Sequence, residues 1–206
     1  MEKDSLTNFL RSGINQLNLS LQEATIAKLI SYISLLTKWN KVYNLIGTNN
    51  QKSIIVRHIF DSLAITQFIK GLNILDFGSG AGFPGLPLAL VLPQWNFILL
   101  DSSKKKTTFL KHVMLMLDIE NIKIVNNRVE KFHFEPSFAT IVTRATTKSY
   151  DIIEKIKHLC SKSGQILIMK GKYPKEELEH LKKPFEIHHI EVPYLNEERH
   201  IIRVLN

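Results

Sequence analysis

The sequence contains almost no cysteine and no long apolar segment. Cys160 is the only cysteine among 206 residues, so no disulfide can form within the chain, and this usage is typical of a reducing compartment. No apolar run approaches the roughly 18 residues that a membrane span needs, and residues 1–11 are too charged for a signal peptide. We therefore expect a soluble, cytoplasmic protein without a membrane segment, in which Cys160 fills a small space in the core.

Several signatures of catalysis and metal binding are also missing. The chain has no G-x-x-x-x-G-K-[S/T] phosphate loop, no G-x-S-x-G elbow, no H-E-x-x-H pair and no cluster of cysteines. Its histidines are scattered, and the adjacent His188 and His189 lie in a predicted strand that points their side chains to opposite faces. We therefore expect no bound metal.

Positive charge is what the sequence has in excess. The formal net charge is +8 and the sequence pI is about 9.5, which favours a polyanionic partner such as nucleic acid or an anionic membrane surface. Charge that serves only solubility is the alternative, and composition alone does not separate the two. With 44% hydrophobic residues, a chain of this length can bury one core and carry a small appendage.

Residues 73–85 form the most informative stretch, because they predict a buried strand, a glycine loop and then a helix. The series Asp76-x-Gly78-x-Gly80-x-Gly82 begins with an acid at the strand end, and glycines allow positive φ and close approach of a ligand. Residues 80–85 also match the dinucleotide pattern G-x-G-x-x-G, so the motif alone is ambiguous. The position of the acid resembles the nucleotide loop of S-adenosylmethionine-dependent methyltransferases, whose ligand carries an amino group.

Asp101 ends the next predicted strand, 25 positions after Asp76. A carboxylate there can accept both ribose hydroxyls of an adenosine, and it serves a methyl donor or a nicotinamide cofactor equally well. The chain shows no second dinucleotide half and closes with two antiparallel-looking strands. These two observations favour the methyl donor over a dehydrogenase cofactor.

The rest of the chain predicts an α/β fold. We expect a Rossmann-like class I S-adenosylmethionine-dependent methyltransferase with a mostly parallel seven-stranded sheet and helices on both faces. Residues 1–70 are expected to form a helical N-terminal extension, and residues 71–206 the methyltransferase domain. Strands are predicted at residues 74–77, 97–100, 122–125, 140–143, 165–169, 186–192 and 200–205, and helices at residues 86–92, 104–117, 150–159 and 175–182.

Two helices are predicted within the extension. Residues 20–23 form a capping-box pattern, Ser-Leu-Gln-Glu, and open a helix that runs to Trp39, a residue expected to serve in packing. A second helix carries Arg57, His58, Asp61 and Ser62 on one face. Arg57 and Asp61 lie four positions apart, so an ion pair on a solvated face is the alternative to a functional role for this face.

The residues after the fourth predicted strand bear on the acceptor of the methyl group. The chain lacks the Asn/Asp-Pro-Pro-aromatic signature of exocyclic amine methylation, and Cys160 in a predicted helix weakens a cysteine-nucleophile mechanism. Arg144 stands there instead; it cannot act as a base but can orient a carboxylate, a phosphate or a guanine edge. Guanine N7 needs no deprotonation, so positioning, which can supply about 7–11 kcal/mol, would suffice.

Together these motifs are similar to those of the RsmG family, also called GidB, which comprises bacterial 16S ribosomal RNA guanine-N7 methyltransferases. The resemblance covers nearly the whole chain in order. Its motifs are Trp39-Asn40-Lys41, Asn44-Leu45, Arg57-His58, Asp61-Ser62, residues 76–85, Leu100-Asp101-Ser102, Arg128-Val129-Glu130, Arg144-Ala145, Lys170-Gly171 and Glu198-Arg199-His200.

The resemblance implies contacts of S-adenosylmethionine with Gly78, Phe83, Val129, Glu130 and Arg144. It implies as target a guanosine in the decoding-region stem-loop of 16S rRNA, which we expect to be bound within a small-subunit particle by a monomeric enzyme. The candidate cofactor-binding residues are Asp76, Gly78, Gly80, Gly82, Phe83, Asp101, Val129, Glu130 and Arg144. The candidate RNA-binding residues are Arg57, His58, Lys104, Lys105, Lys170 and Arg199, with Arg144 and Lys170 as candidates for positioning the substrate.

Two other functions remain open from the sequence. Ribose 2′-O methylation of RNA would use Lys41, Lys170 and Glu198 around the hydroxyl group, although it lacks an acid after the fourth strand. A nucleotide-regulated RNA-binding protein without catalysis would bind S-adenosylmethionine or RNA but transfer no methyl group.

Overall fold

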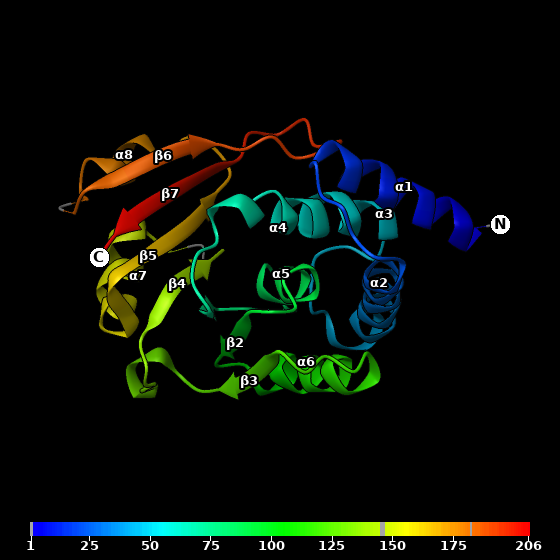
Figure 1. The fold of residues 1–206 in the computed structure, drawn as a ribbon, viewed down its shortest axis with the longest axis horizontal. Helices are drawn as coiled ribbons and strands as arrows, with labels where there is room; N and C mark the ends of the chain where they lie inside the picture. The colour runs from blue at the N-terminus through cyan, green and yellow to red at the C-terminus, as the bar shows by residue number, and fades with distance from the viewer. Residues whose placement is uncertain (1, 145–146, 182) are drawn as a thin grey trace.

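A seven-stranded sheet in the order β3-β2-β1-β4-β5-β7-β6 forms the centre of the computed structural model (Figure 1). The structure describes residues 2–144, 147–181 and 183–206. The strands are β1 (Asn73–Phe77), β2 (Asn96–Asp101), β3 (Ile122–Asn126), β4 (Phe138–Thr143), β5 (Cys160–Lys170), β6 (Phe185–His189) and β7 (His200–Leu205). Strands β1 to β5 are parallel, and β7 is antiparallel to both β5 and β6. The predicted fold class is confirmed.

Helices cover both faces of this sheet (Figure 1). The helical elements are α1 (Glu2–Gln16), α2 (Glu23–Tyr43), α3 (Gln51–Ile54), η1 (Ile55–Phe60), α4 (Asp61–Leu63), η2 (Thr66–Phe68), α5 (Gly85–Val91), α6 (Lys104–Met116), η3 (Val129–Lys131), α7 (Ser149–Ile156), η4 (Lys157–Leu159) and α8 (Lys175–Leu178). The predicted helix at 175–182 is observed only as α8, and residue 182 lies outside the described residues. The predicted strand at 186–192 is shorter, because β6 ends at His189.

The start of α2 differs from the prediction. A capping box needs the serine at the N-cap, but α2 begins at Glu23 and its N-cap is Gln22, which makes no side-chain capping bond. Ser20 therefore lies before the helix, and the predicted capping box is wrong. The helix also runs past Trp39 to Tyr43. It ends at Asn44, which adopts a left-handed conformation and donates its backbone N–H to the carbonyl oxygen of Asn40.

The second predicted helix is divided into short pieces. A π-helical segment, η1, lies between the single turns of α3 and α4, and a 3-10 turn, η2, follows. π-helical turns inside helices are often found at functional sites. Here η1 carries Arg57 and His58, and α4 carries Asp61 and Ser62. These are the four residues that the sequence predicts on one helix face.

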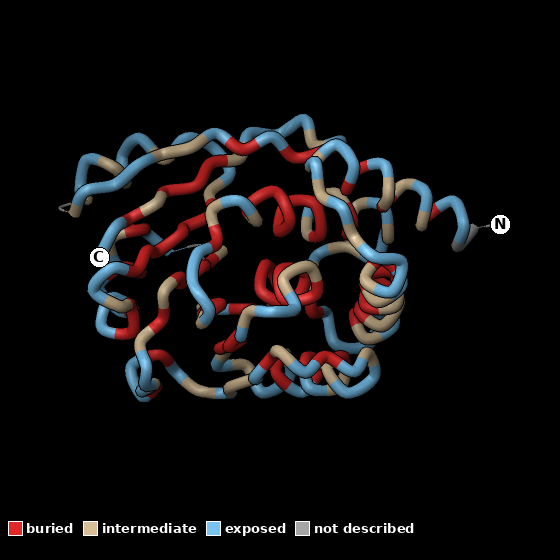
Figure 2. The backbone as a smooth tube through the Cα atoms, in the orientation of Figure 1, coloured by how far each residue is buried: buried red, intermediate tan, exposed pale blue. Residues whose placement is uncertain are grey.

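Two apolar cores lie on opposite faces of the sheet. The larger joins α1 and α2 to α5 and α6, with Leu10, Ile33 and Phe109 fully buried among its members. This core includes residues on both sides of position 70, and the division of the chain there stays a prediction. Figure 2 shows the buried segments concentrated in the strands and in the helices that pack on them.

The smaller core lies beneath α7 and contains Cys160. Burial raises the pKa of this thiol to about 11, as expected for a residue that fills core space. Its predicted place in a helix is wrong, because the chain turns through η4 and Cys160 is already the first residue of β5. Among the described residues, no helix is long and apolar enough to cross a membrane.

Tyr32 connects the N-terminal helices to the loop after β1. Its side chain is fully buried, and its hydroxyl donates a 2.7 Å hydrogen bond to the carbonyl oxygen of Ala81. Tyr32→Phe keeps the ring but leaves that buried carbonyl without its partner, so we expect a loss of about 1–3 kcal/mol in the free energy of unfolding, measured by urea denaturation. Tyr43→Phe, at an exposed ring on the same helix, is the control; equal losses in both variants would contradict this role for Tyr32.

Candidate active site

The loop between β1 and α5 exposes its backbone at the carboxyl edge of the sheet. Gly78 and Ser79 both donate their N–H groups to the carbonyl oxygen of Leu100 at the end of β2. Gly78, Gly80 and Gly82 have φ angles of 73°, 60° and 111°, a region that side-chain-bearing residues rarely adopt. A Cβ at Gly78 would meet nothing within 4 Å. The loop is therefore held by β2 while its first glycine faces open space.

Asp76 is buried behind this loop rather than exposed in front of it. Its Oδ2 accepts the N–H of Gly85 at 2.9 Å, whereas its Oδ1 is buried without a hydrogen-bond partner. Burial raises the pKa of Asp76 to about 7, so the carboxyl group exchanges its proton near neutral pH. An unpaired buried oxygen of this kind is suited to a ligand that brings its own donor.

Asp101 lies at one side of a pocket of about 340 Å³ formed by the ends of β1 and β2 and the segment after β3. Its two carboxylate oxygens accept the N–H groups of Gly80 and Ser103, each at 2.8 Å, so each oxygen retains a further lone pair. Among the predicted cofactor residues, those that line this pocket are Gly78, Asp101, Val129 and Glu130.

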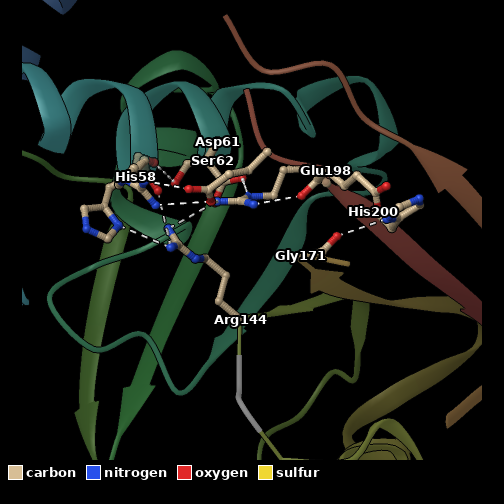
Figure 3. Close-up of polar contacts among 10 residues, drawn as sticks. His58, Asp61, Ser62, Arg144, Gly171, Glu198 and His200 are labelled. Atoms are coloured by element: carbon tan, nitrogen blue, oxygen red, sulfur yellow. Dashed lines mark hydrogen bonds and ion pairs between the residues drawn. The ribbon is translucent and has the colours of Figure 1, made fainter. Parts of the chain in front are cut away.

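A buried cluster of charges lies beside the loop, centred on Asp61 (Figure 3). The Asp61 side chain lies between two arginines. Nε of Arg199 is 3.0 Å from Oδ1 of Asp61, and Nη1 of Arg144 is 3.4 Å from its Oδ2. Burial raises the pKa of Asp61, and the two guanidinium groups act against that rise. Nη1 of Arg144 is itself buried and makes no hydrogen bond of good geometry. The 3.4 Å contact is therefore a charge interaction that leaves a donor available.

Arg57 does not pair with Asp61. Its guanidinium binds the carboxylate of Glu197, with Nη2 2.6 Å from Oε1, and Arg199 also contacts Glu197 at 3.3 Å. The four-residue spacing suggested a local ion pair, but Asp61 is buried toward β4 and β7, where arginines distant in sequence reach it. The alternative of a solvated Arg57–Asp61 pair is therefore wrong.

His58 is a neutral side chain in this cluster. Burial, assisted by the nearby Arg144, Arg57 and Arg199, lowers the pKa of His58 to about 3. Its ring stacks on Phe83, with centroids 4.7 Å apart, and its Nδ1 lies 3.2 Å from Nη2 of Arg144. A neutral ring can accept that hydrogen bond from Arg144, so His58 orients the guanidinium and carries no positive charge of its own.

A second pocket, of about 550 Å³, opens at the ends of β4 and β5. Arg144, Lys170 and Arg199 line it together with Asp61 and Glu177. The motifs around it contact one another, since Nδ1 of His200 lies 3.0 Å from the carbonyl oxygen of Gly171 (Figure 3). The structure thus brings together in one place residues that the sequence separates by more than a hundred positions.

The remaining RNA candidates lie elsewhere. Lys104 and Lys105 are exposed at the start of α6 and line neither of these pockets, and Lys105 donates a hydrogen bond to the carbonyl oxygen of Tyr43. Trp39 packs on Phe109, as expected for a packing residue. Ala145 of the Arg144-Ala145 motif lies outside the described residues. Within the described part of the chain, no group of three or more candidate ligands could hold a metal ion.

Sequence reasoning missed the acidic partners of these cations. Glu197 joins Arg57 to Arg199, and Glu177 binds Lys170 at 2.8 Å. Glu177 lies in a charged segment without a motif, and Glu197 directly precedes the Glu198-Arg199-His200 motif without being part of it, so no local signal marked either glutamate. Only the pairing of the strands brings these segments to the edge of the sheet.

The whole arrangement was compared with known proteins. The family model GidB, described as rRNA small subunit methyltransferase G, matches residues 25–202. The chain belongs to the GidB family. The family resemblance seen in the sequence motifs is confirmed.

GidB relatives match along almost their entire length. A ribosomal RNA small subunit methyltransferase G of Nitrosococcus oceani is 42% identical over 200 residues, covering 96% of this chain and 94% of the relative. A protein of the same description from Coxiella burnetii (strain RSA 331 / Henzerling II) is 41% identical over 201 residues, with 98% of each covered.

Solved structures with the same fold are more distant from this GidB member. A SAM-dependent methyltransferase from Aquifex aeolicus has a TM-score of 0.60 at 16% identity and covers 82% of this chain and 98% of its own. TYW2 of M. jannaschii in complex with AdoMet has a TM-score of 0.56 at 11% identity, covering 71% and 74%. At such identities the similarity shows the fold alone.

Gly85 holds Asp76 in place, and this contact can be tested. A Cβ at Gly85 would lie 2.6 Å from Oδ2 and 2.8 Å from Cβ of Asp76, so Gly85→Ala must displace the buried carboxyl group. Overpacking of this kind typically costs about 1–3 kcal/mol, and we expect that loss in urea denaturation together with weaker binding of S-adenosylmethionine in calorimetry. Gly47→Ala is the matched control, since its Cβ would meet nothing within 4 Å. Unchanged binding in a destabilised Gly85→Ala variant would argue against a role for Asp76 in the site.

Proposed function

We propose that this protein transfers a methyl group from S-adenosylmethionine to N7 of guanosine 527, in the decoding-region stem-loop of 16S rRNA. Membership in the GidB family confirms the predicted activity, an S-adenosylmethionine-dependent methyltransferase of small-subunit rRNA. The dehydrogenase reading of the glycine loop is thereby excluded. The observation that carries the assignment of site residues is a pair of buried polar atoms that make no hydrogen bond.

Those two atoms fit the methionine end of the cofactor. Among the residues that the structure describes, Oδ1 of Asp76 and Nη1 of Arg144 are the buried side-chain polar atoms without a hydrogen-bond partner. One belongs to an acid and the other to a permanent cation, and the methionine moiety carries an ammonium and a carboxylate group. Asp76 would hold the ammonium and Arg144 the carboxylate, which would satisfy both buried groups.

The adenosine end fits the pocket at the ends of β1 and β2. Asp101 there retains lone pairs for the ribose hydroxyls, and Gly78 leaves the space that a side chain would occupy. Val129 and Glu130 line the same pocket from the segment after β3. Gly80 and Gly82 shape the loop, and the Phe83 ring contacts both His58 and Arg144. The predicted cofactor residues can therefore act as one site.

Methyl transfer to guanine N7 requires positioning of the two reacting groups and no proton transfer. When bound, S-adenosylmethionine supplies a methyl group on a positively charged sulfur, which an unprotonated ring nitrogen can take up. Arg144 stays protonated and cannot remove a proton, but Asp61 and the neutral His58 fix its guanidinium beside the loop. Holding the two reacting groups in line can supply about 7–11 kcal/mol of the barrier.

The acceptor would enter through the second pocket. Parallel sheets of this kind bind ligands where the strand order reverses, which here is between β1 and β4. The smaller pocket lies on the β1 side of that point, and the pocket with Lys170 and Arg199 lies on the other side. Lys170 and Arg199, together with Arg57 and His58 and with Lys104 and Lys105 on the adjoining surface, are candidates for holding RNA. The net charge of +8 favours such a partner.

Ribose 2′-O methylation finds no support in the geometry. It would require Lys41, Lys170 and Glu198 to meet at one hydroxyl group. Lys41 lines a groove between α1, α2 and α3, whereas Lys170 lines the pocket beside Arg144, and Glu198 is exposed. We also propose that the protein acts in the cytoplasm as a monomer, on rRNA within a small-subunit particle.

The identity of the methylated nucleoside is the direct test. Small-subunit particles and protein-free 16S rRNA, both from cells that lack this protein, are incubated with radiolabelled S-adenosylmethionine and digested to nucleosides. We expect the label in 7-methylguanosine, with more transfer to the particle than to free RNA. Label in a 2′-O-methylated nucleoside would overturn the proposal in favour of ribose methylation, and binding without transfer would favour a non-catalytic RNA-binding protein.

The proton equilibrium of Asp76 predicts a pH dependence of cofactor binding. The pKa of Asp76 is raised to about 7, so the carboxylate that would hold the ammonium group is mostly protonated at pH 5.5 and mostly ionised at pH 7.5. Calorimetry should show the affinity for S-adenosylmethionine rising by roughly 20- to 30-fold across this range, because the ionised fraction of a group with a pKa of about 7 rises by that factor between pH 5.5 and pH 7.5. Asp76→Asn should bind weakly at both pH values; the same rise in this variant would rule out Asp76 as the source.

A further inference from the structure

Lys170 and Glu177 form an ion pair on one wall of the second pocket. Nζ of Lys170 lies 3.1 Å from Oε1 and 2.8 Å from Oε2 of Glu177, and it also donates to the carbonyl oxygen of Thr147 at 3.3 Å. The side chains are 11% and 26% exposed. One of the three N–H donors of the ammonium group goes to Oε1 and one to the carbonyl oxygen of Thr147, whereas the contact with Oε2 is a charge interaction. The third donor is therefore available to a ligand.

Glu177 is fixed from behind by the first residue of α7. Its Oε2 accepts both the N–H of Ser149, at 2.8 Å, and the Ser149 hydroxyl, while Oε1 contacts only Lys170 among the described side chains. Burial acts to raise the pKa of Glu177, but the hydrogen bonds from Lys170 and Ser149 outweigh it and leave the pKa below its ordinary value. Oε1 is thus an ionised oxygen with a spare lone pair beside a spare N–H.

This donor next to an acceptor matches one edge of guanine. O6 of the base accepts a hydrogen bond, and N1–H and the amino group at N2 donate. Adenine presents the reverse order, with a donor at N6 and an acceptor at N1, so it would leave both partners of the pair unsatisfied. Sites built to hydrogen-bond a particular edge reject the wrong base strongly, because buried polar groups are then unpaired.

We propose that the Lys170–Glu177 pair recognises the target base, with Lys170 donating to O6 and the spare lone pair of Glu177 Oε1 accepting from the amino group at N2. The inference rests on the proposed function and names the specificity-determining residues of the same site. N7 lies across the ring from N2, so a base held at this wall turns N7 toward Arg144 and the cofactor loop. Tyr173, 52% exposed, adds an aromatic side chain to the same pocket on which a base can stack.

A phosphate group fits this wall less well. Arg144, Arg199 and Lys170 would attract it, but the ionised Glu177 faces the same space and would repel it. A base edge uses the carboxylate as a partner, whereas a phosphate must avoid it. The two occupants therefore give opposite expectations for removal of Glu177.

An inosine substitution measures the contact to N2 directly. Inosine keeps O6, N1–H and N7 but lacks the amino group. Small-subunit particles are reconstituted with rRNA that carries guanosine or inosine at the target position, and kcat/KM is measured for each. The wild type should prefer guanosine by about tenfold or more, the size expected for one hydrogen bond to a charged acceptor. Glu177→Ala should lose activity on guanosine and show a ratio near one.

Glu176→Ala is the control. Glu176 is an exposed neighbour of the same charge that does not line the pocket. This variant should keep the wild-type preference for guanosine. Glu177→Gln keeps the shape of the side chain and serves as a second variant if Glu177→Ala does not fold. It should show an intermediate ratio, because its amide oxygen is a weaker acceptor than the carboxylate.

Three outcomes would overturn the inference. A wild-type ratio near one means that N2 is not recognised. An unchanged ratio in both Glu177 variants places the recognition elsewhere, and higher activity of these variants would indicate a phosphate at this wall. No methyl transfer to the guanosine particle by the wild type would overturn the proposed function itself, and this inference with it.

Discussion

A single buried carboxylate, that of Asp61, holds the two sides of the site together. The residue is 3% exposed, and a charge at such depth is tolerated only when it is paired and hydrogen-bonded. Arg144 comes from the end of β4 and Arg199 from the loop before β7, 138 positions after Asp61. Removing one partner of a buried pair of this type typically costs about 3–5 kcal/mol, because the other charge stays behind. The positions of both arginines therefore depend on Asp61.

The same burial acts in opposite directions on the two titrating groups nearest to the loop. It raises the pKa of Asp76 to about 7 and lowers that of His58 to about 3, since each group disfavours its charged form away from water. His58 can then stack on Phe83 as a neutral ring and leave the positive charge to Arg144. The pKa of Asp76 is close to neutral pH, so a bound cationic ligand would favour the ionised carboxylate. Such a site favours a ligand that carries both charges.

Strand order explains why two pockets adjoin this cluster. Chain connections leave β1 toward β2 on one side and return to β4 on the other, so the carboxyl ends of the two halves face a common edge. The pocket on the β1 side is bordered by the backbone of the glycine loop. The pocket on the β4 side is lined by long cationic side chains and by Glu177. The first side suits a small nucleoside, and the second suits a polyanion from which one base has been withdrawn. The antiparallel β7 delivers Arg199 and His200 to this second side.

Local patterns in the sequence were enough to predict the fold class and the family, because apolar periodicity and an acid followed by alternate glycines are properties of short segments. The same local reasoning erred for Cys160, which begins β5, and for Arg57 and Asp61, which do not pair. The meeting of Lys170 with Glu177 likewise had no signal in the chain. An ion pair forms where desolvation and geometry allow, and the packing of sheet and helices sets both. The sequence therefore names the candidate residues, whereas the fold assigns their partners, their protonation and the pocket that each one faces.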